Sequence, residues 1–322
     1  MIRNRSYGFI AIALGAWLVP MLAPTPAQAQ LWTWTKDQMM DYTKAWTGDR
    51  FPDGRPKVPD ALLERARGLS MEEIMINWGG GGPGGPGGPG GAPARSAYSQ
   101  YEDGWQVLHP GKTLVGRAVT MAFMPARPDL DSVVMAKAKE KGIDRLNNQT
   151  VLDMLQPGDV LVVDLYGKKD GGTIVGDNLF YYIMKTTKTG GLVVDGAMRD
   201  LQGIAEMDMP AYYRSVHPSW IGGVTLSAVN VPVRIGDVTV MPGDVVVGDR
   251  EGVTFIPAQN AETILDRADE THIHDEWTRK KFDEGKYKSS DIYGSPRDPA
   301  LKQEYQEYLK KRLEEIRKSN PK

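Results

Sequence analysis

The sequence predicts an α/β fold, because segments typical of strands and of helices alternate along the middle of the chain. Apolar runs typical of buried strands lie at 113–124, 160–163 and 192–194. Segments with helical spacing lie between them, at 130–141 and 179–184. Strands that alternate with helices usually form a sheet whose face the helices cover.

The composition is that of an ordinary globular protein. The chain has 322 residues, enough for one large domain or two small ones, with 41% hydrophobic and 25% charged residues. Its net charge of −2 predicts no general attraction to nucleic acid or to membrane surfaces. The absence of cysteine excludes disulfides, thiolate zinc sites and cysteine nucleophiles.

The beginning of the chain has the pattern of a secretory signal peptide. Arg3 and Arg5 precede an apolar run at 8–22, and Ala27-Gln28-Ala29 forms a small-x-small cleavage site. A membrane anchor is the alternative, but the run is short for a membrane span and prolines interrupt it. We therefore expect residues 1–29 to be removed after Ala29, and the mature protein to be periplasmic or secreted without a membrane anchor.

Composition divides the rest of the chain into a core domain and extensions. Residues 30–58 form an N-terminal extension whose aromatic residues we expect to dock on the core domain, residues 59–285. Within the core, Gly79–Gly91 contains only glycine and proline. It lacks the Lys-Ser/Thr of a phosphate-binding loop, so we interpret 79–95 as a disordered surface insertion. Residues 286–322 form a C-terminal helical extension.

Capping residues and periodicity predict the remaining elements. Asp60 is expected to cap one short helix, and Ser70 with Glu73 forms a capping box for the next. Short β segments follow one another in the second half of the chain, separated by turn residues. Helical segments are expected at 36–47, 201–207, 258–282 and 299–317, and extended segments at 211–216 and 224–257.

The stretch 171–200 carries the candidate chemistry. Glycines precede Asp177-Asn178 and an apolar helical run, which Gly190-Gly191 is expected to end. A glycine-flanked helix start presents unpaired N–H groups to a carboxylate or phosphate. The following strand is expected to end at Asp195-Gly196. Arg199-Asp200 just beyond it place a guanidinium, which clamps anions, beside a possible metal ligand.

These residues also carry a family resemblance. G-D-N-L is followed about twelve residues later by G-x-x-x-D-G-x-x-R-D, and the similarity continues through three β segments. The chain resembles the RraA-like family, which includes the class II 4-hydroxy-4-methyl-2-oxoglutarate (HMG) aldolases. The resemblance covers roughly 62–285, and its motifs lie at 176–179, 191–200, 229–233, 241–247 and 249–257.

The resemblance implies an RraA-like α/β/β layered sandwich of the swivelling β/β/α type, and roles for residues beyond the strand. Arg199 would bind the keto oxygen of pyruvate and stabilise the enolate, and Asp200 would hold Mg²⁺ or Mn²⁺. From the residues alone, Arg199 pairing with Asp195 or Asp200 is the alternative. An ordinary helix cap is the alternative for Asp200.

The resemblance also implies a cradle for the substrate carboxylate at the helix start. The cradle begins at Gly176 and uses the backbone N–H groups around Asn178 and Leu179, while Asp177 contacts metal-bound water. An ordinary cap is again the alternative, because Asp-Asn is common before an apolar helix.

In HMG aldolases an acid from the C-terminal helix of a neighbouring subunit reaches the active site. The resemblance therefore implies a homotrimer or hexamer, with Glu276 as that acid and Glu270 nearly as suitable. His272 and His274 suggest zinc, but side chains two residues apart diverge on a helix. We interpret them as part of a solvated helix end.

Three functions follow. The first is a metal-dependent lyase that releases pyruvate from a 4-hydroxy-2-oxo acid by retro-aldol cleavage, or from oxaloacetate by decarboxylation. The second is a non-catalytic regulator, as RraA itself inhibits a cytoplasmic ribonuclease, although a signal peptide would separate the two proteins. The third is an exported enzyme that acts on another carbonyl substrate, such as a sugar derivative, with the same site.

Overall fold

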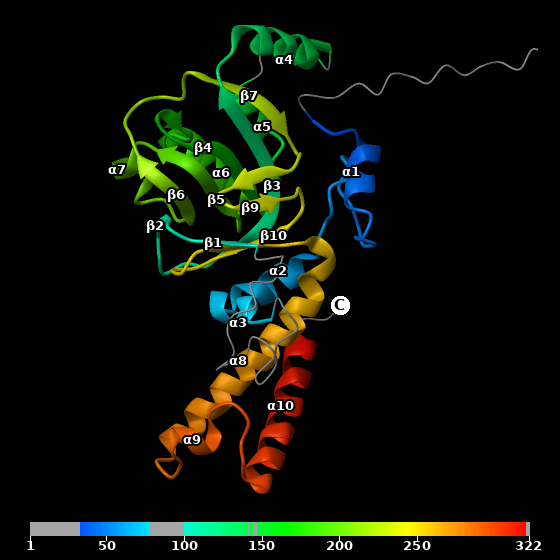
Figure 1. The fold of residues 1–322 in the computed structure, drawn as a ribbon, viewed down its shortest axis with the longest axis vertical. Helices are drawn as coiled ribbons and strands as arrows, with labels where there is room; N and C mark the ends of the chain where they lie inside the picture. Colours follow the sequence, from blue (N-terminus) through cyan, green and yellow to red (C-terminus); the bar gives the residue numbers. More distant parts are fainter. Residues whose placement is uncertain (1–32, 78–99, 141, 144–146, 320–322) are drawn as a thin grey trace, which may run out of the picture. The chain divides into compact units, whose positions relative to one another are not determined.

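A mixed β-sheet forms the centre of the chain in this computed structural model, which describes residues 33–77, 100–140, 142–143 and 147–319. The sheet has the order β1-β11-β10-β3-β4-β5-β6-β2, and β3, β4, β5 and β6 run parallel to one another (Figure 1). The predicted signal peptide and the predicted insertion at 79–95 lie outside the described residues. The parallel strands are β3 (Leu114–Pro125), β4 (Asp159–Thr173), β5 (Gly191–Met198) and β6 (Ala211–Val216).

Antiparallel strands complete the sheet on both sides of this parallel group. One edge follows β3 through β10 and β11 to β1, and the other edge is β2 beside β6. β7 pairs with the last residues of β3, and β8 with β9 forms a separate hairpin. These strands are β1 (Tyr101–Glu102), β2 (Gln106–Leu108), β7 (Val224–Val229), β8 (Val233–Ile235), β9 (Val238–Val240), β10 (Val245–Gly248) and β11 (Val253–Ile256).

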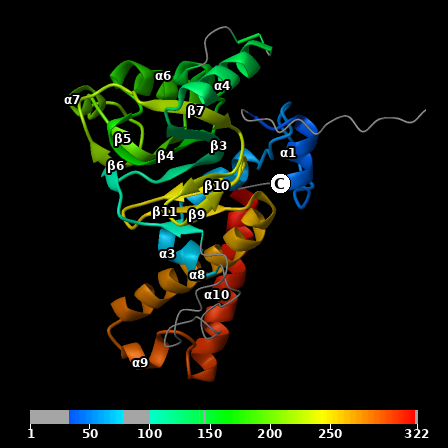
Figure 2. The same ribbon diagram turned by 45° about the horizontal axis from the view of Figure 1, so that its top comes forward.

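Helices cover the parallel strands on one face, and β8, β9, β10 and β11 pack on the other face. In β5, Leu192 and Val194 face the helical side, while Val193 joins the core beneath β8, β9 and β10. Figure 2 shows α6 and α4 on one side of the sheet, and α3 and α8 on the other. This order of layers confirms the predicted α/β/β fold. The covering helices are α4 (Pro128–Glu140), α5 (Asn148–Leu152), α6 (Asp177–Thr187) and α7 (Leu201–Ile204).

A third core lies on the outer face of β10. Val245 and Val247 point to this side, away from Val246, and pack with residues of α2 and α8. The last helices extend from there, because Trp277 of α8 packs with Ile292 and Leu301. The elements involved are α1 (Lys36–Tyr42), α2 (Asp60–Arg67), α3 (Met71–Met75), η1 (Ala258–Asn260), α8 (Ala261–Asp283), α9 (Ser289–Ile292) and α10 (Pro299–Ser319).

The predicted N-terminal extension contacts the core in part. Trp46 packs against the cluster that α2 and α8 form, and Thr33 bridges to Val229. Tyr42 instead stacks on Trp34 within the extension, with ring centroids 4.5 Å apart, and is 62% exposed.

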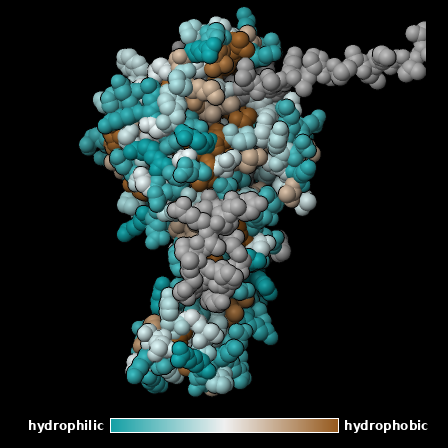
Figure 3. All heavy atoms as spheres, viewed as in Figure 1, coloured by the Kyte–Doolittle hydropathy of each residue, from teal (hydrophilic) through white to brown (hydrophobic). Residues whose placement is uncertain are grey.

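The surface is mostly hydrophilic on the face shown in Figure 3, with apolar side chains gathered over α4. Val133 and Met135 of that helix are exposed. Within the described residues, no helix combines the length and the apolar character that a membrane span requires.

Several predicted boundaries were wrong for identifiable reasons. Pro59, not Asp60, is the N-cap of α2, and Asp60 instead pairs with Arg117. The capping box of Ser70 and Glu73 is confirmed. Ala258–Asn260 is a 3-10 turn, so the long helix begins only at Ala261.

Two strands are longer than expected, and one helix is ended by a different residue. β4 continues beyond Asp164 to Thr173, and β5 continues beyond Asp195-Gly196 to Met198. α6 ends at Thr187, and its C-cap Lys188 has a positive φ of 61°, before Gly190 is reached. Gly190 has a packing role instead, because a Cβ there would lie 1.7 Å from the backbone oxygen of Asp159.

This contact predicts a specific stability effect. Gly190→Ala should destabilise the fold by about 1–3 kcal/mol or more, since backbone must move to admit the methyl group. Gly111→Ala is the matched control, because a Cβ there meets nothing within 4 Å. Urea unfolding of the two variants checks the prediction. Equal free energies of unfolding would contradict the assigned role.

Candidate functional site

The start of α6 forms one half of the candidate site. Gly176 is its N-cap, and the backbone oxygen of Gly176 accepts a hydrogen bond from the Phe180 N–H at 2.9 Å. The N–H groups of the first turn have no backbone acceptor inside the helix, as at any helix start. The Asn178 N–H donates to the carboxylate of Asp177 at 2.7 Å. The first turn therefore carries positive partial charge beside an acidic side chain.

The end of β5 forms the other half. The strand stops at Met198, Arg199 follows, and Asp200 adopts the left-handed region with φ 58° as the N-cap of α7. The Asp200 side chain makes no capping hydrogen bond. The expected alternative of an ordinary cap therefore holds for its backbone position but not for its carboxylate.

The two halves meet at Gly176. A Cβ on this residue would lie 2.5 Å from Asp200 Oδ2 and 2.7 Å from Arg199 Nη2. The missing side chain is what lets the guanidinium and the carboxylate reach the helix start. A Cβ on Gly203 of α7 would lie 3.3 Å from Asp177 Oδ2, which places that carboxylate beside the same turn. The structure thus brings the predicted residues of α6 and β5 together.

Arg199 and Asp200 are not consumed by a strong ion pair. Arg199 Nε lies 3.8 Å from Asp200 Oδ2, which is beyond hydrogen-bond distance, and the two side chains are 33% and 41% exposed. Asp195, the other expected partner of Arg199, is instead bonded to Arg214 at 2.9 Å. Both functional groups beside Gly176 are therefore available to a ligand.

The donor set fits a magnesium-type ion rather than a structural metal. The described residues contain no group of three or more His, Cys, Asp or Glu side chains that could hold a metal ion. Mg²⁺ needs fewer protein ligands, because it commonly keeps several waters and binds one or two carboxylates together with substrate oxygens. The exposed carboxylate of Asp200, with Asp177 near α7, meets that requirement.

The loop 217–223, between β6 and β7, lies beside the end of β5, and the sequence predicted no place for it in the site. The His217 N–H donates to the backbone oxygen of Met198, the last residue of β5, at 3.1 Å. Further along the loop, the Thr173 hydroxyl donates to the backbone oxygen of Ser219. Trp220, also in this loop, is 77% exposed. The sequence signal was the glycine-rich end of β4, to which the loop is bonded.

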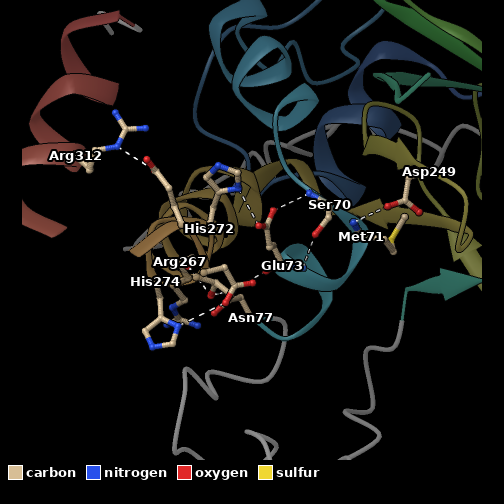
Figure 4. A network of polar contacts seen from close by, with 12 residues as sticks. Ser70, Met71, Glu73, Asn77, Asp249, Arg267, His272, His274 and Arg312 are labelled. Atoms are coloured by element: carbon tan, nitrogen blue, oxygen red, sulfur yellow. Dashed lines mark hydrogen bonds and ion pairs between the residues drawn. The ribbon is translucent and has the colours of Figure 1, made fainter. Parts of the chain in front are cut away.

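Glu276 lies elsewhere in the chain. On α8 its carboxylate accepts hydrogen bonds from Tyr308 at 2.7 Å, and from Lys280 and Arg312 at 3.1 Å. Burial alone would raise the pKa of Glu276, but these three hydrogen bonds lower it to about 2. Figure 4 shows Arg312 on α10 at this end of the network. Within one chain Glu276 joins α8 to α10, and its contact with a neighbouring subunit stays a prediction.

Glu270, the second candidate acid, lines a cavity of about 680 Å³. Residues of α2, α8 and α10 form its walls, including Leu62 and Leu313. The structure therefore does not bring Glu270 to Arg199 within one chain either.

Both histidines lie within α8 rather than at its end, and the interpretation as solvated was wrong for His274, whereas the side chain of His272 is 42% exposed. His274 is 5% exposed, and its ring bonds the backbone oxygen of Gly294, which packs against α8. His272 bonds Glu73 of α3 at 2.8 Å (Figure 4). Both histidines join α8 to neighbouring segments.

Comparison with known proteins identifies the family of this chain. Residues 94–255 match the model of the RraA-like family, described as Aldolase/RraA. The chain belongs to this family. A putative HMG aldolase of Halalkalibacterium halodurans is 34% identical over 120 residues, which are 37% of this chain and 56% of the relative. Another from Deinococcus radiodurans is 32% identical over 117 residues, 35% of this chain and 72% of the relative.

Solved structures support the fold of this RraA-like chain. Streptomyces coelicolor RraAS2, described as an unusual member of the RNase ES inhibitor RraA family, has a TM-score of 0.56 and 28% identity. The match covers 70% of this chain and all of RraAS2. An uncharacterised Pseudomonas syringae protein shares the fold at 20% identity and a TM-score of 0.55, over 74% and 96% of the two chains. The chain spans about half the length of the first curated relative it matches.

The bond between His272 and Glu73 predicts a pH-dependent stability. Hydrogen bonding to Glu73 raises the pKa of His272 above 6.5. Burial would raise the pKa of Glu73, but the hydrogen bond from His272 lowers it below 4.5. The contribution of this pair to the free energy of unfolding is therefore complete between pH 4.5 and pH 6.5. It is lost as the pH rises through the raised pKa of His272, or falls through the lowered pKa of Glu73.

Glu73→Gln tests this pair while keeping a side chain that suits the capping box. The variant should lose more unfolding free energy, relative to the natural chain, at about pH 5.5 than at about pH 8.5. Urea unfolding at the two pH values measures the difference. A loss of the same size at both would show that the ion pair contributes nothing.

Proposed function

We propose that the protein is a divalent-metal-dependent lyase that releases pyruvate from a 4-hydroxy-2-oxo acid or from oxaloacetate. The observation that carries this proposal is the meeting of Arg199 and Asp200 with the start of α6 at Gly176. A 2-oxo acid has an anionic carboxylate beside a keto group. The keto oxygen gains negative charge when an enolate forms, and the carboxylate beside it stays negative. The site offers N–H groups for the carboxylate, and a cation for the keto oxygen.

Each group has a separate task in this proposal. The N–H groups around Asn178 and Leu179 hold the substrate carboxylate, which the dipole of α6 favours and which replaces Asp177 Oδ1 as the acceptor of the Asn178 N–H. Arg199 faces the keto oxygen, where negative charge develops as the bond between C3 and C4 breaks and its electron pair enters the enolate. Asp200 would hold Mg²⁺ or Mn²⁺, and a bound ion supplies Lewis acidity. Asp177 would accept a hydrogen bond from water in the same space.

The proton balance of the retro-aldol reaction is simple. The 4-hydroxyl group loses its proton as the carbonyl of the second product forms, and C3 of the enolate gains one. Water in the site can carry this proton, since Asp177 and Asp200 are hydrogen-bond acceptors at its edge. The acid of a neighbouring subunit, Glu276 or Glu270, is proposed to assist, and requires a trimer or hexamer.

Names of relatives support this function, and one similarity favours an alternative. Several relatives are named putative HMG aldolases. RraAS2 is described within an RNase ES inhibitor family, so a non-catalytic regulator is the second candidate. Export of the chain after cleavage at Ala29, also proposed, would separate it from a cytoplasmic ribonuclease. A sugar-derived carbonyl substrate remains a third proposal for the same site.

Replacing Arg199 and replacing Asp200 should impair the enzyme in different ways. Arg199→Ala should keep metal binding but lower turnover by about 10²-fold or more, because it removes a contact made to developing charge. Asp200→Ala should abolish the response to Mg²⁺ or Mn²⁺, since one carboxylate with waters leaves no reserve ligand. The assay is pyruvate release from oxaloacetate or 4-hydroxy-4-methyl-2-oxoglutarate, corrected for decarboxylation by free metal. Equal rates of pyruvate release by the natural chain and both variants would rule out the lyase.

Gly176→Ala should inactivate the enzyme without removing any functional group. Its methyl group would occupy the space of Asp200 Oδ2 and Arg199 Nη2, and displace both. A Gly-to-Ala change at a cap costs only about 1 kcal/mol of stability, so the fold should persist. Gly68→Ala, where the nearest atom is 3.7 Å from the Cβ position, is the control. Pyruvate release at the natural rate from Gly176→Ala would mean that the close approach is not needed.

A further inference from the structure

The last part of β4 is held by a loop rather than by a continuous ladder. The pairing of β4 with β5 shifts twice between Asp164 and Thr173. β4 ends at Thr173, three residues before Gly176, so the placement of this part of the strand decides where the start of α6 lies. The loop 217–223 bonds this part of β4 where the ladder is interrupted.

Ser219 makes two of the bonds between the loop and β4. Its Oγ accepts a hydrogen bond from the Gly171 N–H at 2.8 Å, and its backbone oxygen accepts one from the Thr173 hydroxyl. The Gly222 N–H donates to the backbone oxygen of Gly171 at 2.9 Å. Both backbone polar groups of Gly171 are therefore bonded to the loop. A Cβ on Gly171 would lie 2.7 Å from the Gly222 oxygen, so the two backbones are in contact.

The other end of the loop is attached to the strand that leads to Arg199. His217 directly follows β6, and its N–H donates to the backbone oxygen of Met198 at 3.1 Å. Ile221 packs against the core on the helical face of the sheet, to which Met198 also belongs. The loop thus joins the residues that precede Gly176 to the residue that precedes Arg199.

The Ser219 hydroxyl connects these two attachments. Its Oγ lies 2.9 Å from His217 Nδ1, and the Ser219 N–H donates to the same nitrogen at 3.3 Å. A ring nitrogen that accepts from an N–H carries no proton, so we assign the hydroxyl as a donor to it. The same oxygen accepts from the Gly171 N–H. Asp170 Oδ1, at 3.6 Å from this nitrogen, is beyond hydrogen-bond distance.

We propose that Ser219 is a positioning residue of the lyase site, a role that rests on the lyase function proposed above. Through Gly171 and His217, its hydroxyl holds the start of α6 at a fixed distance from the turn after β5. The Ile174 N–H also joins these segments, by a bond to the backbone oxygen of Ala197 at 3.0 Å. One such bond still permits rotation, and a displacement of about 1 Å can lower a rate by about 10²-fold.

Oxalate reports this role, because one of its carboxylates needs the start of α6 and the other needs the turn after β5. Mn²⁺ alone needs only Asp200. Calorimetric titration of the full chain measures the affinity for Mn²⁺, and then for oxalate with Mn²⁺ saturating. The variants are Ser219→Ala, which removes the hydroxyl, and Ser219→Thr, which keeps it.

Ser227→Ala is the matched control. The Ser227 hydroxyl is also held within the protein, and it donates to the backbone oxygen of Ala122 at 3.0 Å. This bond joins β7 to β3 and neither half of the site. Urea unfolding of both alanine variants shows whether they are folded under the conditions of the titration.

Ser219→Ala should bind Mn²⁺ as the natural chain does, but oxalate about tenfold more weakly. Ser219→Thr should bind oxalate more tightly than Ser219→Ala, and Ser227→Ala should match the natural chain. Equal oxalate affinity in the natural chain and Ser219→Ala would overturn the proposal and leave the lyase intact. An equal loss in Ser227→Ala would also overturn it, by assigning the loss to general destabilisation. Absence of oxalate binding in the natural chain would instead overturn the lyase, and the positioning role with it.

Discussion

The candidate site depends on one close approach, between the start of α6 and the turn that follows β5. Gly176 has no Cβ, and the space that a Cβ would need is taken by Asp200 Oδ2 and Arg199 Nη2. The helix start supplies N–H groups, and the turn supplies a cation and an anion. Separately each would be an ordinary surface feature. Together they place N–H groups, a cation and a carboxylate at one point, which is the arrangement that the proposed lyase requires.

The parallel sheet holds the two segments at this close approach. β4 and β5 keep register from Val160 beside Gly191 to Asp164 beside Asp195, and Gly190 lets the chain pass against the backbone of Asp159. Beyond Asp164 the register shifts, yet Thr173 still pairs with Ala197. The two segments that carry the site thus leave neighbouring strands of a buried sheet. The N-terminal extension braces the other end through Arg55 and Asp159.

The sequence predicted what short-range patterns encode. G-D-N-L at the start of a helix and Arg199-Asp200 after a strand are local signals, and the layered fold followed from the resemblance and is confirmed. Distant contacts decided the rest. The end of β4 is glycine-rich and polar, and it is a strand because β5 and Ser219 bond it. His274 is buried because Gly294 returns to it. No local pattern reports either contact.

In the proposed lyase, Asp200 and Arg199 bind a divalent ion and a 2-oxo acid at one place. Calorimetric titration with oxalate, a stable analogue of the pyruvate enolate, measures whether they do. We expect oxalate to bind the natural chain only when Mg²⁺ or Mn²⁺ is present, and not to bind Asp200→Asn under the same conditions. Oxalate binding of equal strength without a metal, or in Asp200→Asn, would show that Asp200 holds no metal at this site.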